Sequence, residues 1–135
     1  MSKAEKLAIE SAARAAVGRQ FSCAPVRSDL AFPNGGASHE FDIYVESVLI
    51  GGVSTSPRKV GARNVNTAEC ERASSEVLWL SLWPGPENRI HVLTDVPMAK
   101  WQANRYRGIP FPHRITIYHY DQRRDALSQV GVLHG

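Results

Sequence analysis

The stretch 38–57, SHEFDIYVESVLIGGVSTSP, contains a carboxylate whose position could support metal chemistry. HEFDIYVE alternates between apolar and polar residues, which predicts a strand with Phe41, Ile43 and Val45 on one face. Asp42 then lies on the opposite, polar face. Mg²⁺ prefers oxygen ligands, but one aspartate alone makes a poor Mg²⁺ site. The alternative is that Asp42 belongs to an ordinary solvated strand face.

A basic cluster follows this stretch and could contact phosphates: Arg58, Lys59 and Arg63. Three phosphate contacts would give a salt slope of about −2.7, which corresponds to weak binding that does not depend on nucleotide sequence. The alternative is a solvated polar loop. Three further arginines would extend the surface if they lie on the same face: Arg105, Arg107 and Arg114.

Other catalytic motifs are missing from the sequence. It contains no P-loop, no Rossmann fingerprint and no Ser-His-Asp motif. Cys23 and Cys70 lack the CxxC spacing of a zinc or redox site. His39 has no partner at a metal-ligand spacing and is interpreted as a surface histidine. His119 lies in an alternating segment and is interpreted as structural.

Hydrophobic periodicity divides the chain into alternating helices and strands. Ser2 and Glu5 have the spacing of a capping box, and Gly18 is the predicted end of the first helix. Segment 48–55 is mostly apolar, as expected for a strand buried on both faces. The predicted elements are helix 3–17, a strand near 20–27, strands 39–46 and 48–55, a polar loop 57–65, helix 67–83, strand 89–95, helix 97–106 and strand 114–121.

This order predicts an α/β fold with a mixed central β-sheet and helices on both faces. The 135 residues, 43% of them hydrophobic, fit a single domain over 1–135 with its core at about 3–121. The net charge of +3 permits nucleic-acid binding without requiring it. The N-terminus lacks the apolar core of a signal peptide, and no run approaches the roughly 20 apolar residues of a membrane span. A cytoplasmic protein without membrane contact is predicted.

The element order, with HEFDIYV followed by LIGGVSTS, resembles the PD-(D/E)XK superfamily of nucleases, which share the restriction-endonuclease-like fold. Members often read FD, then IGEVKTS, then a helix. The resemblance spans about residues 3–121 and implies that Asp42 corresponds to the first metal-binding aspartate. Gly52 then stands where the second acid belongs, and Ser54 stands where the lysine belongs.

These two replacements affect the chemistry that the resemblance implies. Two carboxylates would hold Mg²⁺ at the scissile phosphate, and the lysine would add positive charge. In some relatives an acid on the following helix replaces the missing one, and here that residue is Glu76. The alternative for Glu76 is an ion pair with Arg72, four residues earlier. Lys59 would replace the lysine if its loop folds back, and Glu10 is a further candidate on the first helix.

The main functional prediction is therefore a nuclease-like pseudoenzyme that associates weakly with DNA or takes part in an assembly and needs no cofactor. The first alternative is an active Mg²⁺-dependent DNA nuclease in which Asp42 and Glu76 hold the metal and Lys59 supplies the positive charge. The second is a protein-interaction module, with a protein partner or a second copy of the chain, that has no role with nucleic acid. If DNA is bound, the predicted contacts are Arg58, Lys59 and Arg63.

The second half of the predicted helix 67–83, VLWLSLW, is apolar almost all round. One sheet can bury only one side of such a helix. We therefore expect its end to be covered by residues 122–135 or by a partner. The alternative is a central helix that packs under the helix at 97–106.

Overall fold

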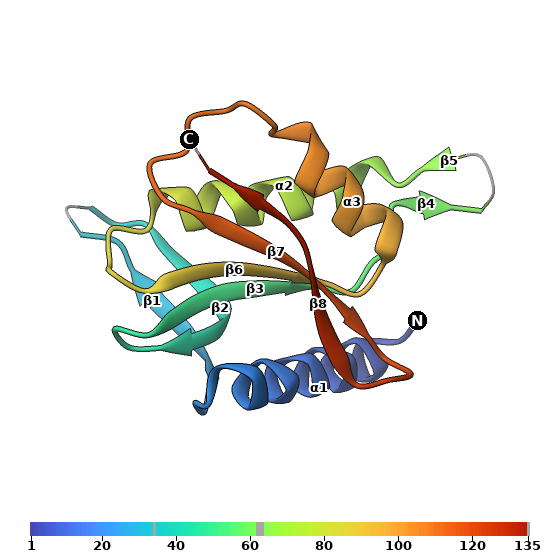
Figure 1. The fold of residues 1–135 in the computed structure, drawn as a ribbon, viewed down its shortest axis with the longest axis horizontal. Helices are drawn as coiled ribbons and strands as arrows, with labels where there is room; N and C mark the ends of the chain where they lie inside the picture. The colour runs from blue at the N-terminus through green and yellow to red at the C-terminus, as the bar shows by residue number, and fades with distance from the viewer. Residues whose placement is uncertain (34, 62–63, 135) are drawn as a thin grey trace.

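The computed structural model describes residues 1–33, 35–61 and 64–134, which form three helices around a six-stranded sheet (Figure 1). Helix α1 covers one face of the sheet, and α2 and α3 cover the other (Figure 1). The predicted α/β class, with a mixed sheet and helices on both faces, is confirmed. The helices are α1 (Lys3–Phe21), α2 (Thr67–Leu82) and α3 (Val96–Arg105).

The strands of the main sheet lie side by side in the order β1-β2-β3-β6-β7-β8. The first three are antiparallel neighbours, β3, β6 and β7 run parallel, and β8 returns antiparallel to β7. Each parallel step contains a helix, α2 before β6 and α3 before β7, as expected for crossover connections. The strands are β1 (Val26–Ala31), β2 (Ser38–Val45), β3 (Leu49–Ser54), β6 (Asn88–Leu93), β7 (Ile115–Asp121) and β8 (Ala126–Leu133).

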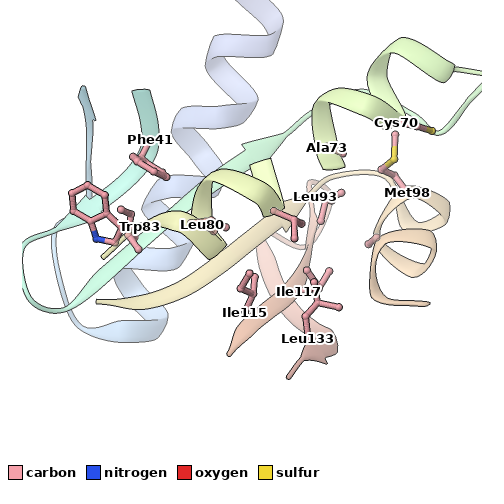
Figure 2. Close-up of a cluster of buried hydrophobic side chains, with 13 residues drawn as sticks. Phe41, Cys70, Ala73, Leu80, Trp83, Leu93, Met98, Ile115, Ile117 and Leu133 are labelled. Carbon is pink, nitrogen blue, oxygen red and sulfur yellow. The ribbon is translucent and has the colours of Figure 1, made fainter. Parts of the chain in front are cut away.

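Apolar side chains fill both spaces between helices and sheet. Under α2 and α3 lies a cluster that includes Phe41, Leu80, Met98 and Ile117 (Figure 2). Under α1 lies a second cluster, which includes Ala13 and Ile43. No helix in the described ranges is long and apolar enough to cross a membrane.

Helix α1 is longer than predicted. The cap at Ser2 is confirmed, because its Oγ accepts a hydrogen bond from the backbone N–H of Glu5 at 3.1 Å. The predicted end at Gly18 is wrong, since the helix continues to Phe21 and Ser22 adopts the left-handed conformation, with φ 54°. A Cβ atom on Gly18 would lie 2.7 Å from the carbonyl oxygen of Cys23. Gly18 is therefore required by the returning chain, and the strand predicted near 20–27 begins only at Val26.

Strand β2 does not alternate as predicted. A step of two positions along β1, from Val26 to Ser28, pairs with a step of three positions along β2, from Tyr44 to Phe41. This bulge inserts one extra residue, so Phe41 packs under α2 whereas Ile43 packs under α1. The prediction that both point the same way is wrong, because a bulge shifts the alternation by one residue.

The apolar end of α2 is not covered by the C-terminal tail. Phe32, which follows β1, contacts Trp79 and Trp83, with a ring-centroid distance of 5.4 Å to each. The tail instead forms β8 at the far edge of the sheet. Leu78 and Leu82 are 55% and 57% exposed, so the helix is less completely buried than its composition indicates.

The predicted polar loop 57–65 contains a short hairpin of β4 (Lys59–Val60) and β5 (Asn64–Val65). It extends from the body of the fold next to the beginning of α2 (Figure 1). Asp95 connects this segment to α3. Its Oδ2 accepts hydrogen bonds from the backbone N–H groups of Arg58 and Met98, each at 3.0 Å, and the second bond caps the helix.

Candidate active site

Asp42 lies where β2 and β3 stop pairing. The paired residues end at Ile43 and Gly51, one step before Asp42 and Gly52. Beyond this point the Asp42 carboxylate replaces the sheet hydrogen bonds, because its Oδ2 accepts from the backbone N–H of Val53 at 2.8 Å. One carboxylate oxygen is thus fixed to the neighbouring strand, and the bulge in β2 places it there.

The environment of Asp42 disfavours its charged form. Burial is the largest cause, and the negative charges of Glu10 and Glu76 add to it, so the pKa of the Asp42 carboxyl rises to about 7. The hydrogen bond from Val53 and the positive charge of Arg27 oppose this rise. Three carboxylates therefore influence one another around Asp42, which is an arrangement that a cation would stabilise.

Helix α1 supports Asp42 from the other side. Arg14 donates from Nε to the backbone carbonyl of Asp42 at 2.6 Å, and its Nη2 pairs with Glu10 at 2.7 Å. Glu10 also pairs with Arg27, at 2.5 Å. Glu10, predicted as a further candidate ligand, is therefore near Asp42 but already held by two arginines.

The carboxylate of Glu76 occupies the space that a side chain on Gly52 would fill. A Cβ atom placed on Gly52 would lie 2.5 Å from both Cγ and Cδ of Glu76, and closer still to its Oε1. Gly52 stands next to Asp42 across the β2–β3 boundary. Helix α2 thus places the Glu76 carboxylate at Gly52, the strand position that corresponds to the second acid of the PD-(D/E)XK motif in the resemblance.

The predicted ion pair between Glu76 and Arg72 does not form. Arg72 pairs with Glu69 at 2.9 Å, whereas Glu76 lies 3.1 Å from Nε2 of His39. The His39 ring stacks on Trp79, with 4.6 Å between centroids and 11° between planes. The interpretation of His39 as a surface histidine is wrong, since the ring is half-buried and positions the Glu76 carboxylate.

Ser54 lies two residues beyond Gly52 and contacts a buried histidine. Its Oγ is 2.8 Å from Nε2 of His91, which is completely buried on the neighbouring strand β6. Burial lowers the pKa of His91 to about 4, and the negative charge of Glu76 only partly opposes this. The His91 ring is therefore neutral near pH 7, and its contact with Oγ holds the Ser54 hydroxyl in place.

A cleft of about 230 Å³ opens beside these residues at the end of β3. Ser54 and Glu76 line it together with Lys6 from α1 and Arg72 from α2. Residues with carboxylate, hydroxyl and ammonium groups, from three different elements, therefore line one small concave surface.

Arg58 and Lys59 of the predicted phosphate-binding cluster do not line this cleft. Lys59 is exposed on β4 and is not among the residues that line the cleft beside Glu76. The Arg58 guanidinium lies 5.5 Å from the centre of the Trp101 ring, and that of Arg105 lies 4.5 Å from the same ring. Arg63 falls outside the described residues. Arg58 and Arg105 thus both make cation–π contacts with Trp101 on α3.

Asp42 and Glu76 are the carboxylates that a divalent cation at this site would use. Within residues 1–33, 35–61 and 64–134, no three His, Cys, Asp or Glu side chains are grouped closely enough to form a metal cage. Mg²⁺ does not require such a cage, since one or two carboxylates and substrate phosphates are its usual ligands. Asp42 and Glu76 meet that requirement.

Sequence reasoning proposed Asp42 and Glu76 as site residues but gave no role there to three residues near them: Lys6, His39 and His91. Lys6 and Glu10 are four residues apart on α1 and share one face, a signal that could have placed Lys6 near the site. His91 follows apolar Ile90 in a strand predicted to be buried, which could have marked it as a buried histidine. No local signal indicates that His39 faces Glu76, because the contact joins residues 37 positions apart.

Comparison with models of known protein families, with curated proteins and with solved structures found no match to this chain.

Proposed function

We propose that this chain is a restriction-endonuclease-like domain that hydrolyses DNA phosphodiester bonds with the help of a divalent cation held by Asp42 and Glu76. The observation that carries the proposal is the position of Glu76, whose carboxylate fills the side-chain space of Gly52 beside Asp42. This contact favours the active nuclease over the pseudoenzyme, because Glu76 from α2 occupies the place of the acid that β3 lacks at Gly52.

The chain's own groups have defined tasks in this proposal. The backbone N–H of Val53 fixes one oxygen of Asp42, and His39 fixes Glu76, so both carboxylates are oriented before substrate arrives. A divalent cation bound between them would supply Lewis-acid stabilisation of the charge that develops on the phosphate. Burial raises the pKa of Asp42 most, and the same positive charge would relieve the repulsion from Glu10 and Glu76 that adds to this rise.

A cleavage assay tests the proposal. Plasmid, linear and single-stranded DNA are incubated with the wild-type chain and Mg²⁺ or Mn²⁺, alongside Asp42→Asn and Glu76→Gln. The control is Glu71→Gln, which removes one exposed acid from the same helix. We expect metal-dependent cleavage that falls roughly 10²-fold or more in both site variants and is unchanged in the control. Cleavage that is absent in the wild type, or equal in all four proteins, would contradict the proposal.

The second candidate is the DNA-associated pseudoenzyme, and one observation favours it. Glu76 is hydrogen-bonded to His39, and Ser54 in the position expected for a lysine is neutral and bonded to His91. A site whose acid and hydroxyl are both occupied by histidines would bind DNA without cutting it. Binding of duplex DNA at low salt, with no cleavage under any metal, would favour this candidate.

A further inference from the structure

Helix α1 presents a stripe of charged residues to the candidate site. Lys6, Glu10 and Arg14 follow one another at intervals of four residues, so their side chains lie along one helix face. Arg14 donates a hydrogen bond to the backbone carbonyl of Asp42, and the negative charge of Glu10 raises the pKa of the Asp42 carboxyl further, beyond the larger effect of burial. Lys6 comes next along the same face and lines the cleft with Ser54 and Glu76. The stripe therefore ends in a lysine that lines the cleft.

The charge of Lys6 is available for a ligand. Two cations, Lys6 and Arg72, and two carboxylates, Glu69 and Glu76, line the cleft, and Arg72 is engaged by Glu69 at 2.9 Å. Lys6, by contrast, makes no ion pair with any described residue. It is half-buried, so its charge is screened less than that of a fully exposed lysine. An anionic group entering the cleft would meet this ammonium.

The Ser54 hydroxyl provides a neutral donor beside Lys6. Nδ1 of His91 is buried and has no hydrogen-bond partner among the described residues. A proton on Nδ1 would therefore be a buried orphan donor, which is rarer in proteins than an orphan acceptor. The favoured tautomer carries the proton on Nε2 and donates it to Ser54 Oγ. The hydroxyl proton of Ser54 is then free to point into the cleft.

We propose that the cleft beside Glu76 is a phosphate-binding subsite in which Lys6 supplies the positive charge and Ser54 a neutral hydrogen-bond donor to one phosphate of the bound DNA strand. The inference deepens the proposed function by assigning a cation to the same site. It differs from the sequence-based hypothesis, which gave this task to Lys59.

The salt dependence of DNA binding tests Lys6 independently of cleavage. Binding of a short fluorescein-labelled duplex is measured by anisotropy with Ca²⁺ as the only divalent ion, across a range of salt concentrations. Each phosphate contact contributes about 0.9 to the slope of log K against log[salt]. We expect Lys6→Gln to lower this slope by about 0.9 and Lys6→Arg to retain it. The matched control is Lys3→Gln, which removes an exposed lysine from the same helix turn and should leave the slope unchanged.

Ser54→Ala separates the neutral donor from the charge. It should weaken binding roughly threefold to tenfold without changing the salt slope, because no charge is removed. If Lys6→Gln and Lys3→Gln change the slope equally, or if neither changes it, the Lys6 subsite is wrong even when the wild type cleaves DNA. If the wild type cleaves nothing while Lys6→Gln alone lowers the slope, the proposed hydrolysis fails and the subsite stands. If the wild type does not bind DNA, both proposals fail.

Discussion

Replacing Gly52 by alanine should disturb Glu76 and little else. The three atoms closest to an added Cβ all belong to the Glu76 side chain, with Cγ and Cδ at 2.5 Å. Ordinary van der Waals contact begins at 3.4 Å, so the carboxylate must move by about 0.9 Å, the difference between these two distances. That movement also strains the hydrogen bond between Glu76 and His39.

The cost of this movement can be bounded. Overpacking a well-packed region typically destabilises a protein by about 1–3 kcal/mol. Against this, alanine in a strand interior is favoured over glycine by roughly 0.5–1 kcal/mol. When Glu76 is first replaced by alanine, the overpacking disappears and only the second effect remains. Gly52→Ala should therefore destabilise the wild type by up to about 2.5 kcal/mol and stabilise Glu76→Ala by about 0.5–1 kcal/mol.

Urea denaturation of four proteins measures this coupling: the wild type, Gly52→Ala, Glu76→Ala and the double variant. The expected interaction free energy is on the order of 1–3 kcal/mol. Effects that add to within about 0.5 kcal/mol would show that the two residues do not share one space, and the central geometric argument would be refuted. The cycle needs no substrate, so it tests the site whether or not the chain cleaves DNA.

Three further predictions concern the acid pair and the core. The pKa of Asp42 is about 7 in the folded protein and near 3.8 in the unfolded chain. Its favourable contribution to the free energy of unfolding is therefore fully present below pH 3.8 and is lost as the pH rises through about 7. Urea titrations without metal compare the unfolding free energies of the wild type and Asp42→Asn. The difference, wild type minus variant, should fall over this pH interval by at most about 4 kcal/mol. Two proteins whose unfolding free energies change in parallel with pH would contradict this prediction. Moving the acid back to the strand, in Gly52→Glu combined with Glu76→Ala, should retain more DNA cleavage than Glu76→Ala alone, and equal rates would argue against spatial replacement. Leu80→Ala should cost about 2–5 kcal/mol in thermal or urea unfolding, whereas exposed Leu82→Ala should stay within about 0.5 kcal/mol, and similar losses would indicate that a partner covers Leu82.

Local signals were sufficient for most of the fold. The cap at Ser2 and the apolar run of β3 act through neighbouring residues, so helix starts and the central hairpin could be predicted from them. The tail was harder, because β8 has a mixed burial pattern as an edge strand and its existence depends on pairing with β7. Gly18 was misread because its role is close contact with Cys23 rather than helix termination.

The candidate site was only partly predictable for a related reason. Asp42 stands in a recognisable strand, but the bulge that orients it is set by pairing with β1 and has no local signal. Glu76 had a plausible partner on its own helix, Arg72, and the structure instead pairs it with His39 from β2. Contacts between distant segments decide which of several equally spaced charges meet, and helical spacing alone does not contain that information.

The most direct test of the acid pair is a crystal of the chain soaked in excess Mn²⁺, with anomalous diffraction recorded at the manganese absorption edge. Mn²⁺ accepts the same oxygen ligands as Mg²⁺ and can be located without ambiguity. We expect an anomalous peak for a manganese ion bound by carboxylate oxygens of both Asp42 and Glu76, and the loss of that peak in Glu76→Gln crystals. A peak that persists in Glu76→Gln, or a wild-type map with no peak at this position, would contradict it.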